Sequence, residues 1–178
     1  MADNNDEIYD VVDRQNRVTG QATRSEIHQR GMLHRSVHTL VFDAAGRLFL
    51  QKRSQAKDEN PGLWDTSSAG HLDRGEAYSD AARRDLNEEL GIDEPVKLFT
   101  RLPASLETAW EHVEVYACTT AQRIVIDPVE ISEGRYFSLS DIDQNIHDDP
   151  GRFTPTFRLI FPRVLDARNL PPKGGAGH

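Results

Sequence analysis

The chain has 178 residues, of which 29 are acidic and 21 are basic, so its formal net charge is -8 at pH 7. A chain of this length buries roughly two thirds of its unfolded surface and can fold as one domain without disulfide or metal staples. The acidic surplus excludes a basic surface over the whole chain for nucleic acid or anionic membranes, so a polyanionic partner must be bound locally or through metal ions.

The composition is that of an ordinary globular protein, with 37% hydrophobic and 28% charged residues. The N-terminus lacks the basic start and apolar centre of a signal peptide, and the apolar runs are too short to span a bilayer. The single cysteine, Cys118, allows no intrachain disulfide. We therefore expect a cytoplasmic protein that acts on a small molecule and has no nucleic-acid or membrane partner.

Both ends of the chain lack a periodic hydrophobic pattern. Residues 1–7 are polar, and residues 169–178 are rich in glycine and proline, so we expect both segments to be loose. Between them, residues 8–168 are expected to form a single domain.

The first predicted elements are a β-hairpin and a short helix. Two apolar stretches, Ile8–Val12 and one around Val18, flank a polar turn and predict the hairpin. Thr23, followed three residues later by Glu26, forms a capping-box pattern, which predicts a short helix that ends at Gly31.

The middle of the chain shows strand patterns before a helix. The segments His34–Phe42 and Arg47–Lys52 are rich in β-branched and apolar residues and predict paired strands. A polar loop over Ser54–Gly62 leads to a strand-like segment, Trp64–His71. An apolar stripe of helical period then predicts a helix over Ser79–Leu90.

The remaining elements mix strands and helices. Strands are predicted over Val96–Arg101, Val113–Thr119 and Gly134–Phe137, and helices over Leu139–Ile146 and Thr156–Ala167. Because the pattern lacks a regular βαβ alternation, it favours an α+β fold or a three-layer sandwich over a doubly wound parallel sheet.

Three carboxylates share one face of the predicted helix. Asp85, Glu88 and Glu89 lie at positions i, i+3 and i+4, where like charges repel each other and weaken the helix. A compensating cation would relieve the repulsion, and crowded oxygen donors favour Mg²⁺ or Mn²⁺. A solvated acidic face is the alternative that helical spacing alone leaves open.

The complete segment resembles the signature of Nudix hydrolases, in which a glycine is followed at fixed spacing by Glu, Arg-Glu, Glu-Glu and Gly. The matching residues are Gly70, Glu76, Arg84, Leu86, Glu88, Glu89, Gly91 and Ile92. One position departs from the signature, because Asp85 stands where Nudix hydrolases have a glutamate.

The resemblance implies an α/β/α sandwich with a mixed sheet and a loop–helix–loop that binds divalent cations, Mg²⁺ or also Mn²⁺. The implied metal ligands are Asp85, Glu88, Glu89 and the carbonyl of Gly70, and the implied catalytic residues are Arg84, Asp85, Glu88 and Glu89. Glu76 and Arg84 would brace the loop against the helix. Family members hydrolyse a diphosphate linked to a nucleoside or another group X, with a carboxylate accepting the proton of the attacking water.

Asp85 leaves the identity of the catalytic base open. Its side chain is shorter than glutamate by one methylene, so it either reaches the metal through water or leaves the base role to an acid outside the signature. Glu111 and Glu114 are the candidates for this further acid, ahead of Glu107, and Glu114 is counted among the candidate catalytic residues.

A wider stretch, roughly residues 8–120, resembles the isopentenyl diphosphate isomerase branch of Nudix proteins. The matching segments are VVDRQNRVTG, LHRSVHTLVF, LQKRSQAK and PGLWDTSSAGH. In the isomerases a metal is held by histidines and glutamates, which implies a second metal site formed by His34, His71, Glu111 and Glu114, with His28 as a further candidate.

The isomerases also require a catalytic cysteine two residues before the histidine that matches His71. This chain has Ala69 there, and Cys118 lies in a predicted strand as a small hydrophobic residue. We therefore expect a diphosphate hydrolase. The second hypothesis is an isomerase-like activity, and the third is a catalytically silent diphosphate-binding domain.

The substrate is less defined by the sequence. Lys52 and Arg53, at the end of a predicted strand, are candidate ligands of a substrate phosphate, unless they are simply solvated. Trp64 either stacks on the substrate or belongs to the core. No adenine- or sugar-specific motif follows the signature. The N-terminal hairpin is a candidate contact for a homodimer.

Overall fold

The structure, a computed structural model, describes residues 4–169. Its N-terminal half contains β1 (Ile8–Val12), β2 (Val18–Thr23), α1 (Arg24–Arg30), β3 (His34–Phe42), β4 (Leu48–Arg53), β5 (Trp64–Asp65), β6 (Ser68–His71) and α2 (Tyr78–Leu90). Its C-terminal half contains β7 (Lys97–Leu102), β8 (Glu111–Thr119), β9 (Ile131–Phe137), α3 (Leu139–Asp148), the 3-10 helix η1 (Pro150–Arg152) and α4 (Pro155–Asn169).

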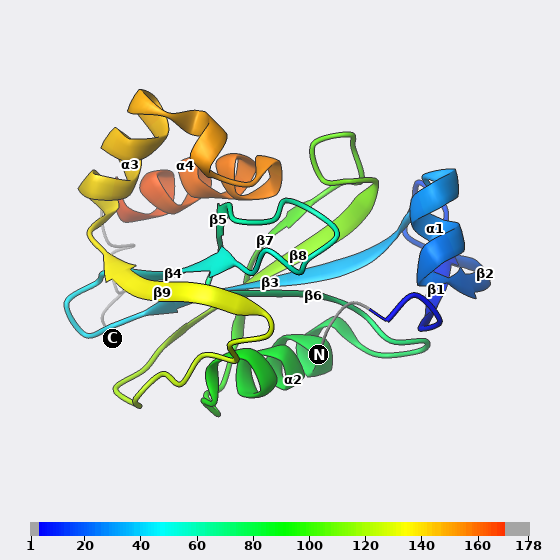
Figure 1. Ribbon diagram of the computed structural model, residues 1–178, viewed down its shortest axis with the longest axis horizontal. Coiled ribbons are helices and arrows are strands. Elements are labelled where there is room, and N and C mark those ends of the chain that lie inside the picture. Colours follow the sequence, from blue (N-terminus) through cyan, green and yellow to red (C-terminus); the bar gives the residue numbers. More distant parts are fainter. Residues whose placement is uncertain (1–3, 170–178) are drawn as a thin grey trace, which may run out of the picture.

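These elements form three layers, as Figure 1 shows. A mixed β-sheet lies in the middle, α2 covers one face, and α3 and α4 cover the other. The α+β sandwich predicted from the sequence is therefore confirmed. Among the residues that the structure describes, no helix has the length and apolar character that crossing a bilayer requires.

The predicted N-terminal hairpin and capped helix are both present beside the sheet. β1 pairs antiparallel with β2. At the start of α1 the Thr23 side chain accepts from the N–H of Glu26, whose carboxylate accepts from the N–H of Thr23. Gly31 ends α1 with φ 58°, a left-handed conformation that glycine adopts without strain.

The central sheet has the strand order β5-β4-β3-β8-β7, with β6 added beside β3 and β9 beside β4. The expected pairing of β3 with β4 covers only the hairpin end, at Val41 with Phe49 and Phe42 with Leu48. On its other side, β3 runs parallel to β8 over its whole length, from His34 opposite Glu111 onward. This register brings together residues that are far apart in the sequence.

The prediction of one continuous strand over Trp64–His71 is wrong, because the chain bends at Thr66 and Ser67 between β5 and β6. The Asp65 carboxylate accepts from the N–H of Thr66 (2.7 Å), and the Ser67 hydroxyl accepts from the N–H of Val41 (2.8 Å). These side-chain bonds hold the bend, so β5 pairs with β4 whereas β6 pairs with β3.

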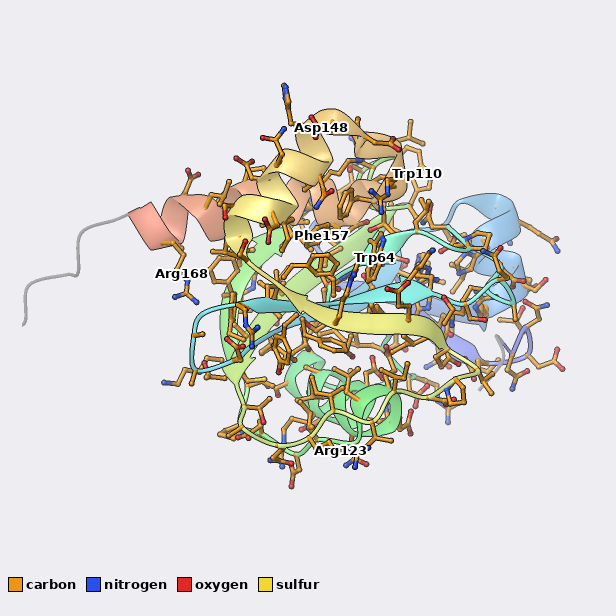
Figure 2. All side chains as sticks on the ribbon, turned by 60° about the vertical axis from the view of Figure 1, so that its left-hand side comes forward. Trp64, Trp110, Arg123, Asp148, Phe157 and Arg168 are labelled. Carbon is orange, nitrogen blue, oxygen red and sulfur yellow. The ribbon has the colours of Figure 1, made fainter. Side chains whose placement is uncertain are left out.

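The hydrophobic core lies on both sides of the sheet. Ala82, Leu86 and Leu90 of α2 are fully buried against one face, as their helical stripe predicts. On the other face, Phe157 of α4 and Trp64 pack between the helices and the sheet (Figure 2). Trp64 is 4% exposed, so of its two predicted roles the structure supports the core role.

The two chain ends differ in part from the expected loose segments. Residues 4–7 lie against the start of α1, where the N–H of Arg24 donates to the carbonyl of Glu7 and the N–H of Ser25 donates to the carbonyl of Asn5. The remaining parts of the predicted loose ends, residues 1–3 and 170–178, lie outside the described residues. Asn169 is the last residue of α4.

Candidate functional site

One guanidinium fastens the loop before α2 to the helix and to β6. The Nε and one terminal nitrogen of Arg84 donate to the two carboxylate oxygens of Glu76, at 3.0 and 2.9 Å. Arg84 also donates to the carbonyl of His71 (3.0 Å) and to Oδ1 of Asp85 (2.6 Å). The arrangement is the brace that the resemblance implies for Glu76 and Arg84, and it fixes Asp85 beside the end of β6.

Asp85 and Glu89 lie one helical turn apart and are both buried, at 5% and 8% exposure. The Glu89 carboxylate accepts from Nε2 of Gln51 (3.0 Å), from the Ser68 hydroxyl (3.3 Å) and from the N–H of Ala69 (3.3 Å). In contrast, Oδ2 of Asp85 is buried without any hydrogen-bond partner among residues 4–169. A buried carboxylate oxygen without a hydrogen bond costs free energy unless a ligand binds to it.

Glycine is required opposite Asp85. A Cβ atom at Gly70 would lie 2.3 Å from Oδ2 of Asp85, closer than real Cβ contacts come. Because Gly70 has no side chain, the carboxylate of Asp85 can approach the backbone of β6 directly. The structure thereby places together Gly70, Asp85 and Glu89, three of the four implied metal ligands.

The charges of this carboxylate pair are poorly compensated. Burial raises the pKa of Asp85 to about 7, although Arg84 opposes the shift. Burial, and then the nearby charge of Asp85, raise the pKa of Glu89 well above its usual range. Two buried carboxylates that resist ionisation fit a bound cation, and their oxygen donors suit Mg²⁺ or Mn²⁺.

The fourth implied ligand, Glu88, stands at the rim of this site. Its side chain is 64% exposed and lies 3.7 Å from Arg84. Glu88 borders a cleft of about 490 Å³ that also contains Gly70, Asp85 and Glu89. A substrate can therefore reach the carboxylate pair from solvent.

A second polar cluster lies on the opposite face of the sheet. His28 of α1, His34 of β3 and His71 of β6 place one ring nitrogen each within 4.8 Å of the others. Nε2 of His71 lies 2.9 Å from Oε1 of Glu111, and Nε2 of His34 lies 3.4 Å from the same oxygen. The β1 residue Tyr9 stacks on the His71 ring, so the N-terminal hairpin covers this cluster.

The histidine cluster contacts two carboxylates, the buried Glu111 and the half-buried Glu59. Burial opposes ionisation of Glu111, but His71 and His34 outweigh it and hold the pKa of the Glu111 carboxyl well below its usual range. The hydrogen bond from His28 lowers the pKa of Glu59 against the effect of burial. Within residues 4–169, Nε2 of His28 and Nε2 of His34 are buried without hydrogen bonds. Three imidazoles and a carboxylate form a donor set that fits Zn²⁺ or Mn²⁺.

Several predicted residues lie elsewhere. Glu114 is not part of the histidine cluster, because its oxygens accept from Arg101 (2.8 Å) and from the Tyr116 hydroxyl (2.6 Å). Glu111 and Glu114 differ by three positions in β8, and an odd separation in a strand directs two side chains to opposite faces. Glu107 lies in the loop after β7. It lines neither the cleft beside Glu88 nor a small cavity that lies beside the histidine cluster.

The two candidate phosphate ligands, Lys52 and Arg53, lie in different surroundings. Lys52 lines neither the cleft at the carboxylate pair nor the cavity at the histidine cluster. Arg53 lines that cavity, where its Nε donates to the carbonyl of Glu59 (2.9 Å) and its guanidinium lies 3.7 Å from Asp65. Lys57, which sequence reasoning missed, lines both spaces. Both Lys57 and Glu59 belong to a polar loop without periodicity, and although Lys57 ends the segment LQKRSQAK, nothing in that segment marks its side chain as part of the site.

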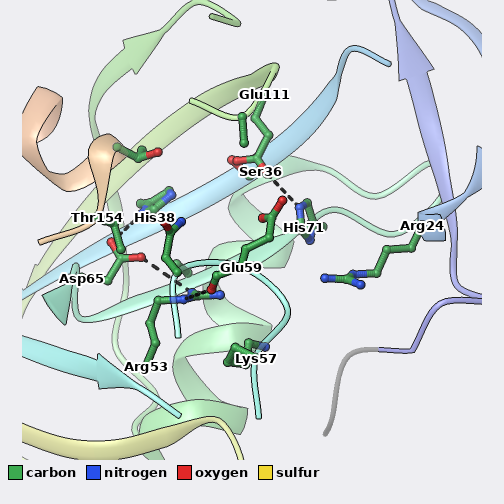
Figure 3. A pocket seen from close by; sticks show the side chains of 15 residues that line it. Arg24, Ser36, His38, Arg53, Lys57, Glu59, Asp65, His71, Glu111 and Thr154 are labelled. Carbon is green, nitrogen blue, oxygen red and sulfur yellow. Dashed lines mark hydrogen bonds and ion pairs between the residues drawn. The ribbon is translucent and has the colours of Figure 1, made fainter. Parts of the chain in front are cut away.

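The histidine cluster borders a small cavity of about 80 Å³ (Figure 3). Its lining is nearly all polar and includes Ser36, His38, Asp65, Glu111 and Thr154. Lys57, Ala69, Gly70 and His71 line both this cavity and the cleft beside α2. The two spaces therefore meet at the edge of β6.

Cys118 has the buried position that was expected of it. It packs with the hydrophobic residues of β3, β4 and α2, and burial raises the pKa of its thiol to about 11. A thiol in this state is a poor nucleophile at neutral pH.

The sequence of the chain matches those of proteins with this architecture. A family model described as the NUDIX domain matches residues 32–157. Isopentenyl-diphosphate Delta-isomerase 2 of Photorhabdus laumondii is 36% identical over 162 residues, which cover 88% of this chain and 91% of that protein. An uncharacterized Nudix hydrolase of Pseudomonas aeruginosa is 34% identical over 135 residues, covering 73% of this chain and 78% of that protein.

Solved structures agree on the fold. A protein from Deinococcus radiodurans superposes with a TM-score of 0.72 at 24% identity, covering 80% of this chain and 90% of that one. A MutT protein from Methanosarcina mazei superposes with a TM-score of 0.65 at 21% identity, covering 76% and 94%. With the signature helix, its glycine and its bracing arginine in place, the chain belongs to the Nudix family.

Proposed function

We propose that the protein is a hydrolase that depends on a divalent cation and cleaves a diphosphate linkage in a small molecule of the nucleoside-diphosphate-X type by water attack on phosphorus. The observation that carries the proposal is the buried pair Asp85 and Glu89, in which Oδ2 of Asp85 has no partner among the described residues. Such a pair is costly in a metal-free protein, and it opens on a cleft large enough for a diphosphate.

The signature residues of the cleft have distinct roles in this proposal. Asp85, Glu89 and the carbonyl of Gly70 would hold the cation, with Glu88 joining from the rim. A cation bound there would neutralise phosphate oxygens and acidify a water molecule. Glu88, an accessible carboxylate of the cleft on the same helix as Asp85 and Glu89, is the proposed acceptor of the proton from the attacking water. Arg84 positions Asp85 and keeps the loop closed on the helix.

The histidine cluster gives the site a second proposed cation position. His28, His34, His71 and Glu111 would hold that cation on the other side of β6. Arg53 and Lys57 line the cavity next to this position and are the proposed ligands of the outer phosphate. The diphosphate would then span the edge of β6 between the two positions.

An isomerase activity is the second candidate, and the histidine cluster with Glu111 is the observation that favours it. The relative from Photorhabdus laumondii bears the name of an isopentenyl-diphosphate isomerase. However, the position implied for the catalytic cysteine is Ala69, whose methyl group cannot exchange a proton. An assay for allylic rearrangement of isopentenyl diphosphate separates the two activities, and we expect no rearranged product.

The proposal is tested by incubating the full chain with a panel of diphosphates, each with Mg²⁺ and with Mn²⁺, and identifying the products. We expect release of phosphate or of a nucleoside monophosphate that stops when a chelator is added. Binding of diphosphates without turnover under either metal would overturn the proposal and leave a ligand-binding Nudix domain.

Substitution of Gly70 by alanine should lower hydrolysis about a hundredfold, because the new methyl group must displace the Asp85 carboxylate by roughly 1 Å. Gly20 in β2 offers a matched control, since a Cβ atom there meets nothing within 4 Å. Steady-state rates of G70A and G20A measure the difference. If G70A keeps the rate of G20A, the close approach of Asp85 to β6 has no part in catalysis.

A further inference from the structure

Two polar side chains of β3 face the small cavity from the same side of the sheet as the histidine cluster. Ser36 and His38 are separated by two positions, so they share one strand face. In the register with β6, Ser36 lies opposite His71 and His38 lies opposite Ala69. All four residues line the cavity.

The tautomer of His38 is set by its neighbours. Its Nδ1 lies 2.8 Å from the Thr66 hydroxyl and 3.7 Å from Oδ1 of Asp65. The Thr66 hydroxyl donates its proton to the carbonyl of Ser68 (3.2 Å), so it can only accept from His38. In a singly protonated ring the proton therefore lies on Nδ1, which leaves Nε2 as an acceptor that has no hydrogen bond to any residue within 4–169.

Ser36 contributes a buried hydroxyl to the lining of the cavity. The residue is 3% exposed, and its Oγ has no hydrogen-bond partner among the described residues. A buried hydroxyl without a partner costs free energy, and its replacement by a methylene-sized apolar group would be neutral or stabilising for the fold. Its presence on the same strand face as His38, in the lining of the same cavity, points to a ligand that completes both groups.

The lining of the cavity is too polar to suit a hydrocarbon chain. Of the residues that line it, only Ala69, Gly70 and Ala109 lack a polar side chain. The alanine opposite His38 leaves room where the isomerase resemblance implies a cysteine. Figure 3 shows His38, Asp65 and Thr154 at one end of the cavity and His71 with Glu111 at the other.

We propose that Ser36 and His38 form a subsite for a hydroxyl group of the moiety X that the diphosphate carries. This inference rests on the proposed hydrolase function, because the cavity joins the cleft of Asp85 and Glu89 at the edge of β6. The substrate hydroxyl donates to Nε2 of His38 and accepts from Oγ of Ser36. The substrate class is accordingly a diphosphate ester of a hydroxylated group, not of an isoprenoid chain.

The test uses two diphosphate esters of equal size, 2-hydroxyethyl diphosphate and n-propyl diphosphate, which differ only by a hydroxyl in place of a methyl group. With Mg²⁺, the wild type should hydrolyse the hydroxyethyl ester with a kcat/KM at least about tenfold higher. Ser36→Ala and His38→Leu should each bring this ratio close to one. His38→Gln, which retains an acceptor, should restore part of it.

Two controls separate recognition from folding. Ser36→Ala should have a Tm equal to or above that of the wild type, because it removes an unpaired buried hydroxyl. His112 lies in β8 next to Glu111 and therefore on the opposite strand face, where its Nε2 bonds to the carbonyl of Asp13 (3.0 Å). His112→Leu should lower the Tm but keep the preference for the hydroxyethyl ester.

The outcomes distinguish this inference from the function on which it rests. If the wild type hydrolyses both esters equally, or if S36A and H38L retain the preference, the subsite is wrong while the hydrolase stands. If the wild type hydrolyses neither these esters nor any member of the diphosphate panel, the proposed function itself fails.

Discussion

Replacing Glu89 by glutamine should reduce diphosphate hydrolysis at least about a thousandfold, which corresponds to about 4 kcal/mol of lost transition-state stabilisation. The amide keeps the shape of the side chain and can still accept from Gln51 and Ser68, but it no longer offers an anionic oxygen to a cation. The substitution also removes a buried charge beside Asp85. The metal-free variant should therefore be at least as stable as the wild type.

A metal ligand differs from a structural residue in this test, because its replacement lowers the rate of hydrolysis but leaves the Tm unchanged or raises it. Glu133 offers a matched control on β9, where its exposed carboxylate lies 3.6 Å from Arg135. E133Q should keep the wild-type rate within about twofold, since exposed ion pairs contribute little. Steady-state kinetics and thermal melts of both variants measure the contrast. A rate for E89Q within threefold of the wild type would remove Glu89 from the cation site.

Without divalent cations, the contribution of Asp85 to stability should decline as the pH rises from about 4 to about 7. Its pKa in the folded chain is raised to about 7 from an ordinary value of 3.8, chiefly by burial. In this window the folded state keeps a proton that the unfolded chain releases, so ionisation favours unfolding as the pH increases. A shift of this size corresponds to about 4 kcal/mol, and Glu89 acts in the same direction.

Mg²⁺ should reverse the effect if Asp85 and Glu89 form the proposed cation site, because a cation held there favours the ionised carboxylates of the folded chain. A concentration of about 100 times the Kd would add about 2.7 kcal/mol, or roughly 5–10 °C in Tm, and this gain should be larger at pH 8 than at pH 5. Asp85→Asn should raise the metal-free Tm at pH 8, flatten its pH dependence and abolish the gain from Mg²⁺.

The comparison between wild type and D85N isolates Asp85 from other titrating groups. Burial lowers the pKa of His71, whereas Glu111 raises the pKa of His34 against the effect of burial, but both histidines are present in both proteins. Glu111 has a lowered pKa, so its contribution is lost only as the pH falls below the usual carboxyl range. Identical Tm profiles for wild type and D85N, with and without Mg²⁺, would mean that Asp85 is not an uncompensated buried acid.

The part of the site that depends on short-range spacing could be predicted from the sequence. Helical periodicity places Asp85 and Glu89 on one face, and the signature spacing pairs Glu76 with Arg84. The capping box and Gly31 fix the ends of α1 in the same way. In each case the residues that interact lie within about one or two helical turns or within a single loop.

The rest of the site depends on register between distant strands, which local patterns do not specify. The parallel pairing of β3 with β8 brings His34 opposite Glu111, and strand alternation then directs Glu114 to the other face. Local sequence patterns make both glutamates candidates and do not show which of them faces the histidines. The bend at Ser67 was missed because it is stabilised by bonds to β3, and these exist only after the sheet has formed.

The central claim, that the buried carboxylate pair serves a hydrolase, is tested most directly by turnover in water enriched in oxygen-18. The full chain is incubated with Mg²⁺ and a diphosphate mixture that includes isopentenyl diphosphate, and the products are analysed by mass spectrometry. Water attack on phosphorus predicts a phosphate product that carries one oxygen-18 atom and that disappears in E89Q. A rearranged allylic diphosphate without oxygen-18, or no labelled phosphate under Mg²⁺ or Mn²⁺, would contradict the claim.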